Sequence, residues 1–151
     1  MSTYRRVPNL RRGAKGQALV EFSLILVPFF LLILGIIDVG RGIYVYNGAA
    51  QAAREIARVT SVYPGSPLGS SSETQDVVAT QEGLVPGLSA SGITIECTAM
   101  DNTLKPGECF TGTANRYVRV TVNVPFNVIY RTFLPVIPTM TFNAVSHIQL
   151  P

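Results

Sequence analysis

An acidic side chain lies inside the most apolar stretch of the sequence. Residues 18–37 contain one charged side chain, Glu21, and the other positions are apolar or small. A charged group near the middle of a bilayer costs about 2.5 kcal/mol or more on insertion scales. The carboxylate therefore either lies hydrated at the shallow headgroup level and does little, or it meets a partner that lowers this cost.

The remaining candidates for chemistry indicate no catalytic centre. One histidine excludes multi-histidine metal sites, and two cysteines alone cannot complete a structural zinc site. His147 alternates with Thr141 and Asn143 on the polar side of a predicted strand, so we expect a surface histidine rather than a general base. Asp38 and Arg41 are three residues apart, a spacing typical of a helical ion pair. We therefore expect no catalytic residue, no metal and no cofactor.

The charge of the chain is concentrated before the apolar stretch. The composition is 47% hydrophobic and 14% charged, below the roughly one-quarter charged residues of an average soluble protein. Five cations and no acid precede residue 16, and the rest of the chain is net acidic. The basic balance therefore belongs to the N-terminal tail and does not indicate nucleic-acid binding. The five cations are Arg5, Arg6, Arg11, Arg12 and Lys15.

The apolar stretch has the length of a transmembrane helix. Twenty residues, 18–37, reach about 30 Å at about 1.5 Å per residue, which is the hydrocarbon thickness of a bilayer. The basic tail predicts a cytoplasmic N-terminus, which places the rest of the chain outside the cytoplasm. A cleaved secretory signal is the alternative, but its apolar region is shorter and ends at a small-residue site that is missing here.

Beyond the span the pattern remains helical and then changes. Alanine-rich residues 43–59 carry a small-residue stripe, and we expect one helix from about Leu19 to Val62. Residues 63–72 form a Pro/Gly/Ser linker. Ser72 and Gln75 resemble a capping box that opens a short helix to about Glu82.

The C-terminal part predicts a small sheet. Alternating apolar residues mark strands at 93–97, 117–124 and about 140–148, with an irregular crossover marked by Pro125, Pro135 and Pro138. The predicted fold class is α+β: a long N-terminal transmembrane and amphipathic helix packed against a small, mostly antiparallel, three- or four-stranded sheet. The expected organisation is a leader at 1–16, a helix at 17–62, a linker at 63–72 and an extracytoplasmic domain at 73–151.

Two cysteines flank a turn-rich connection in this outer domain. Cys97 and Cys109 are separated by eleven residues that include Pro106-Gly107. Outside the cytoplasm we expect them to form a disulfide, which stabilises a loop of this size by about 3 kcal/mol in the entropic model. Two reduced thiols are the alternative if the topology is inverted or the compartment is not oxidising.

The start of the span resembles a known family. The segment Lys15-Gly16-Gln17-Ala18-Leu19-Val20-Glu21-Phe22 joins the end of a basic leader, a glycine and the start of an apolar helix. Its glutamate is the fifth residue after the glycine. This segment resembles the type IV pilin class and is most similar to the TadE-like pseudopilins, or minor pilins, of the tight-adherence (Tad/Flp) system. The similarity continues through Pro28, the Gly35–Arg41 junction and the Ala/Arg-rich helix to about residue 60.

The resemblance implies roles for individual residues. Gly16 would be the last leader residue, cut by a prepilin peptidase, and Gln17 the new N-terminus. Glu21, beside Phe22, would meet a neighbouring subunit's N-terminal amine during assembly. Gln17 departs from the phenylalanine common in type IV pilins, which leaves N-methylation open.

Three functions compete at this point. The leading hypothesis is a membrane-anchored pseudopilin without enzymatic activity, whose partners are other pilin subunits, the inner-membrane Tad assembly platform and the bilayer. The second is an uncleaved bitopic protein whose outer domain binds a ligand or a partner. The third, a hydrolase using His147 with a serine, lacks a nucleophile-elbow or metal motif.

Overall fold

The architecture is taken from a computed structural model, which describes residues 13–99, 116–132 and 139–150. The chain divides into two compact units, Met1–Ile37 and Asp38–Pro151. The elements with their bounds are α1 (Gly13–Val62), α2 (Ser72–Leu84), η2 (Ala90–Gly92), β1 (Ile93–Ala99), β2 (Arg116–Phe126), η3 (Ile129–Thr132) and β3 (Met140–Gln149).

Helix α1 is 50 residues long and begins six residues earlier than the sequence predicts. It continues through Pro28, although a proline inside a helix removes one backbone donor and crowds the carbonyl four residues earlier. The helix ends at Val62, as predicted. Pro64 explains this end, because the residue before a proline is pushed out of the helical conformation.

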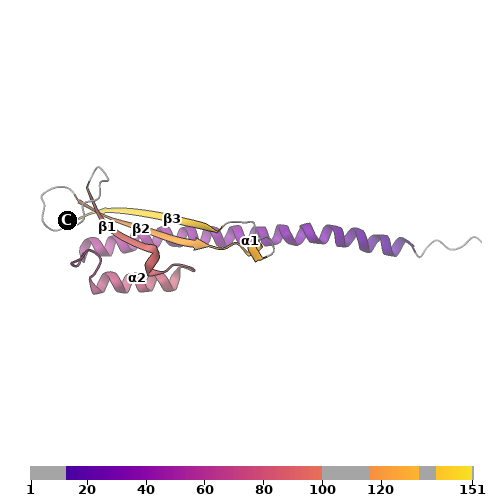
Figure 1. Ribbon diagram of the computed structural model, residues 1–151. Helices are drawn as coiled ribbons and strands as arrows, with labels where there is room; N and C mark the ends of the chain where they lie inside the picture. The colour runs from indigo at the N-terminus through magenta and orange to yellow at the C-terminus, as the bar shows by residue number, and fades with distance from the viewer. Residues whose placement is uncertain (1–12, 100–115, 133–138, 151) are drawn as a thin grey trace, which may run out of the picture. The chain divides into compact units, whose positions relative to one another are not determined.

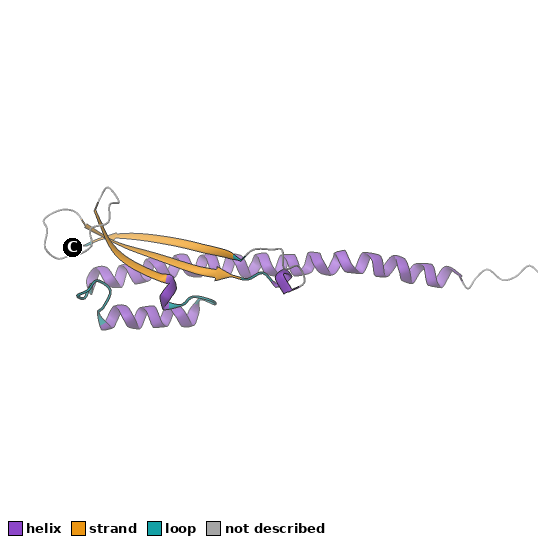
Figure 2. Ribbon diagram, viewed as in Figure 1, coloured by secondary structure: helices purple, strands orange, loops and turns teal. Residues whose placement is uncertain are grey.

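Three strands form one antiparallel sheet in the order β1-β2-β3, with β2 in the centre (Figures 1 and 2). The register aligns Ile95 with Val120 and Val122 with Ala144, so apolar residues of all three strands lie on one face. Strand β2 runs two residues further than predicted and includes Pro125. Because β1 pairs only as far as Val122, Pro125 has a neighbouring strand on one side alone, a position that tolerates proline.

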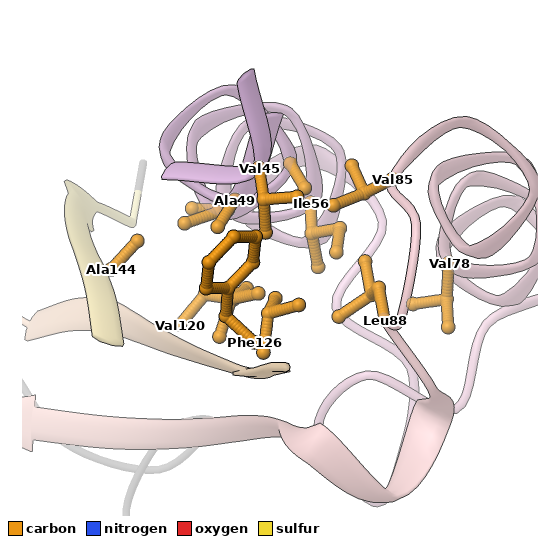
Figure 3. Packing of buried hydrophobic residues seen from close by; sticks show 14 of the residues in the cluster. Val45, Ala49, Ile56, Val78, Val85, Leu88, Val120, Phe126 and Ala144 are labelled. Carbon is orange, nitrogen blue, oxygen red and sulfur yellow. The ribbon is translucent and has the colours of Figure 1, made fainter. Parts of the chain in front are cut away.

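The core of the second unit lies between this apolar face and the part of α1 that follows Asp38 (Figure 3). Val118, Val120, Val122 and Val124 of β2 are fully buried against the helix. The helix offers mainly alanines on the facing stripe, and small side chains let the backbone approach the sheet closely. The buried residues of this stripe are Val45, Ala49, Ala52, Ala53, Ile56 and Ala57.

Helix α2 covers the remainder of the core on the same side of the sheet. Val78 of α2, with Val85 and Leu88 just after it, joins the cluster beside α1 (Figure 3). The predicted capping residue was wrong by one position: Ser71, not Ser72, is the N-cap, and its Oγ accepts a hydrogen bond from the Thr74 N–H. The Ser71 hydroxyl also donates to the Tyr63 carbonyl at 2.6 Å, which ties the start of α2 to the end of α1.

The α+β class and the packing of a long apolar helix's outer half on a small antiparallel sheet are therefore confirmed. The sheet has three strands within the described residues. Its other face is polar: Asn143 Nδ2 donates to Asn123 Oδ1 at 2.8 Å, and His147 lies exposed opposite Arg119.

Candidate functional site

Glu21 lies on the first unit's part of α1, on an exposed apolar surface. Leu19, Val20 and Phe22 beside it are each more than 60% exposed. The helix is long and apolar enough to cross a membrane, and none of its most apolar window is buried. This agrees with a single-pass membrane anchor, because an apolar surface exposed around a whole helix is unfavourable in water and suited to lipid.

The Glu21 carboxylate has a neighbour one turn earlier on the helix. Gln17 Nε2 donates to Glu21 Oε1 at 3.4 Å, a long hydrogen bond between residues four apart. Among the described side chains, no basic group forms an ion pair with Glu21. The sequence reasoning did not anticipate the Gln17 amide as a partner, although the i,i+4 spacing was a sufficient signal. The structure therefore brings Gln17 and Glu21 together on one face.

Gly16 occupies an open position near the beginning of α1. A Cβ added at Gly16 meets no atom within 4 Å, so packing within the chain does not require a glycine there. Gly40 is equally open, so openness alone does not mark a processing site. Gly16 differs from Gly40 in following a run of cations and in lying within the first turns of the helix, where backbone N–H groups lack helical partners.

A second cluster with charged groups lies at the start of the second unit. The predicted Asp38–Arg41 pair is present, with Arg41 Nη1 3.0 Å from Asp38 Oδ1. Asp38 is buried, and its Oδ2 also accepts a hydrogen bond from the Ile129 N–H at 2.8 Å. The Arg41 guanidinium lies 5.4 Å from the centre of the Phe126 ring. Asp38 is thus a structural link between α1 and η3, a role that local spacing did not reveal.

Aromatic rings extend this cluster along the sheet. The Phe126 and Phe142 rings are 5.4 Å apart, and Tyr46 meets Phe142 edge-on at 6.0 Å. Gly42 faces both phenylalanines, and a Cβ there would lie 3.7 Å from each ring. A small residue at this position lets the rings pack on the helix backbone.

The other candidate residues occupy different parts of the second unit. Cys97 is buried on β1, whereas Cys109 lies outside the described residues, so their disulfide stays a prediction. Arg54 and Arg58 are exposed on α1. Arg58 donates to both oxygens of Glu55, at 2.6 and 3.0 Å, and this hydrogen bonding lowers the pKa of the Glu55 carboxyl from its ordinary value.

The described residues contain no group of three side chains suited to hold a metal ion. His147 is on the polar face of the sheet, as the alternation predicted. The unusual chemistry of this chain is therefore the carboxylate on the apolar helix and its surroundings.

The similarity of this chain to known proteins lies in that helix. The family model for TadE-like proteins matches residues 16–58. This segment is similar to TadE-like proteins. The resemblance predicted from the residues around Gly16 and Glu21 is thereby confirmed. No curated protein and no solved structure matches the chain.

The TadE-like segment includes the apolar run, the Asp38–Arg41 pair and the whole alanine stripe that packs on the sheet. The match supports association with the Tad pilus system. The strands lie outside the matched segment, so the TadE-like resemblance concerns the helix.

Proposed function

We propose that this protein is a pseudopilin, or minor pilin, that takes part in assembling a Tad/Flp-type pilus or a related secretion fibre. The observation that carries the proposal is the TadE-like match, which begins at Gly16 and includes the apolar run 18–37 with its single acid, Glu21. The protein acts by assembly and catalyses no reaction.

In this proposal a prepilin peptidase hydrolyses the peptide bond between Gly16 and Gln17. Water adds across the bond, leaving a carboxylate on Gly16 and an amine on Gln17. The bond lies within the first turns of α1, so the peptidase has to unwind only the end of the helix. Cleavage also removes the five leader cations that hold the N-terminus at the cytoplasmic face.

Glu21 then serves as the carboxylate partner of an N-terminal amine. Each of these charged groups is costly near lipid, and pairing them between staggered helices lowers both costs and specifies the register. The exposed Phe22 ring supplies apolar contact beside that pair. The Glu21 carboxylate accepts only a long hydrogen bond from the Gln17 side-chain amide and forms no ion pair with a described basic group, which leaves its charge to be balanced by an amine of a neighbouring subunit.

We further propose where the protein lies and which partners it contacts. The leader is cytoplasmic, α1 crosses the inner membrane once, and the second unit lies in the periplasm or in the fibre. Its partners are the peptidase, other pilin subunits and the inner-membrane Tad assembly platform.

N-terminal sequencing of the membrane-extracted protein tests the proposal. Gln17 as the first residue supports processing, and Gly16→Leu should leave a precursor sixteen residues longer. Gly40→Leu is the matched control, because a Cβ at either glycine meets no atom within 4 Å. Met1 or Ser2 as the first residue in cells that contain the peptidase would instead support the uncleaved bitopic protein.

A further inference from the structure

We propose that one end of the second unit docks on the headgroup region of an anionic phospholipid bilayer. This end is a surface that we call the collar, formed by Val39, Arg41, Ile43, Arg131 and Met140. The proposal rests on membrane anchoring by the apolar run but not on cleavage at Gly16 or on fibre assembly.

The collar begins where the apolar run ends. Asp38 follows Ile37 directly, and α1 continues as one helix beyond this point. The polar zone on each side of the hydrocarbon is about 5–7 Å thick, which at about 1.5 Å per residue is the rise from residue 38 to residue 41 or 42. Residues 38–41 therefore lie at the depth of the headgroups, and Ile43 lies at the water-facing edge of that zone.

Contacts within the second unit hold two further segments at the level of Asp38 and Arg41. The Ile129 N–H donates to Asp38, which fixes η3 and its Arg131 beside the helix. The Phe126 ring lies against the Arg41 guanidinium, and Phe126 pairs with Met140 at the start of β3. The collar therefore gathers residues from α1, η3 and β3.

The side chains of the collar suit a phospholipid interface. Val39, Ile43 and Met140 are at least 50% exposed, although each is apolar. Arg131 is exposed, and the Arg41 side chain is half exposed despite its contact with Asp38. Apolar side chains beside cations favour a surface that offers acyl chains and phosphates together.

The charge balance of this end favours anionic lipid. Among the described acids, Asp38 is the one that pairs with a collar residue, and both of its oxygens already accept hydrogen bonds, from Arg41 and from the Ile129 N–H. Its carboxylate is buried and therefore not presented to the headgroups. Arg131 remains a cation that no described acid pairs.

Tryptophan reporters test the docking directly, because the natural chain contains no tryptophan. The full chain, carrying Met140→Trp, is reconstituted in phosphatidylcholine/phosphatidylglycerol vesicles whose acyl chains are brominated near the ester end. The matched control is Val145→Trp, which changes an exposed apolar residue of the same strand. Its position is about 17 Å further along, at about 3.4 Å per residue. Leu24→Trp reports insertion of the apolar run.

Docking predicts that bromine quenches the Met140→Trp variant several-fold more than the Val145→Trp variant. Adding Arg131→Glu should lower the quenching of Met140→Trp in vesicles that contain phosphatidylglycerol, and much less in pure phosphatidylcholine. Equal, weak quenching at positions 140 and 145 with strong quenching at position 24 would overturn the docking. Emission at position 140 that shifts with the protein-to-lipid ratio but is not quenched would overturn it in favour of a second copy. Weak quenching at position 24 would show that the apolar run is not inserted, which would overturn the docking because the docking requires that anchor.

Discussion

Asp38 Oδ2 accepts a hydrogen bond from the Ile129 N–H at 2.8 Å, across 91 positions of the sequence. The carboxylate is buried, and its other oxygen accepts from Arg41. One side chain thus joins the helix directly after the apolar run to the segment that connects β2 and β3.

Replacing Asp38 should destabilise the second unit. Asp38→Ala leaves the Ile129 N–H without its acceptor and Arg41 without its partner, a loss of about 1–3 kcal/mol in the free energy of unfolding. Asp38→Asn should lose less, because its amide oxygen can still accept one hydrogen bond. Urea unfolding of the full chain in detergent, followed by circular dichroism, measures both. Asp76→Ala on the exposed side of α2 is the control, and equal effects at positions 38 and 76 would contradict the link.

A larger residue at Gly48 should also destabilise the fold. A Cβ there would lie 3.1 Å from Val85 Cγ2, so the segment after α2 would have to move away from α1. We expect Gly48→Leu to lower the free energy of unfolding by about 1–3 kcal/mol, the usual cost of overpacking. The same unfolding measurement applied to Gly40→Leu, where nothing lies within 4 Å, should show a smaller loss. A smaller loss at position 48 than at position 40 would argue against close packing there.

The predicted disulfide has a simple diagnostic. Non-reducing mass mapping should find Cys97 and Cys109 joined within one chain, and Cys97→Ser should lower the free energy of unfolding by about 2–5 kcal/mol. Cys109→Ser and the double variant Cys97→Ser/Cys109→Ser should lower the free energy of unfolding by a similar amount, because each removes the same bridge. A large loss for Cys97→Ser alone would instead assign the effect to the buried position of that side chain.

Glu21 should act in assembly rather than in folding. Glu21→Ala removes the cost of placing a polar group in lipid, so insertion should be at least as good as in the wild type. Fibre yield and adherence of Glu21→Ala should fall. Those of Glu21→Gln should fall less, because an amide forms a hydrogen bond without balancing the charge of an amine. Gln17→Ala is the control: it removes the 3.4 Å bond within the helix and retains the backbone amine. Sheared fibre is compared at matched levels of processed protein. A wild-type fibre yield from Glu21→Ala would contradict the assembly role and support the alternative that Glu21 is a shallow, hydrated carboxylate that does little.

Glu55 should titrate below its ordinary range. Its hydrogen bonds from Arg58 lower the pKa of the folded carboxyl, so the pair contributes stability above the pKa of the unfolded chain. That contribution is lost as the pH falls through the lower folded pKa. Because both side chains are largely exposed, the effect on stability is small and weakens with salt. NMR titration should show the pKa of Glu55 rising in Arg58→Ala, and an unchanged value would contradict the pairing.

The elements marked by a short-period sequence pattern could be predicted. Alternating valines placed β2 and its buried face, and the apolar run placed α1, because each pattern directly reflects the periodicity of its element. The strand ends were less accurate. Pro125 was assigned to the crossover, yet it pairs with Thr141 inside the sheet, since β1 is too short to reach it.

Features that depend on distant partners were not predictable. Ser72 was predicted to cap α2, whereas the N-cap is Ser71, whose hydroxyl also donates to the carbonyl of Tyr63, eight residues earlier. The Asp38–Arg41 pair followed from local spacing, whereas the bond to Ile129 required the folded chain. The Gln17–Glu21 contact is local, but the pilin resemblance implies a role only for the backbone amine of Gln17 and so did not predict a contact of its side chain.

The alanine stripe of α1 has a consequence for how sequence variation is tolerated along one helix. Before Asp38 the exposed positions, such as Leu24 and Leu32, accept apolar side chains of any size but reject polar ones, because their surroundings are lipid. After Asp38 the sheet-facing alanines, such as Ala49 and Ala53, have no space for a larger side chain, whereas the outward Gln51 and Arg54 are free to change. In saturation mutagenesis of α1, the polarity of the new side chain should therefore decide tolerance before Asp38, and its volume should decide tolerance at the sheet-facing positions after Asp38.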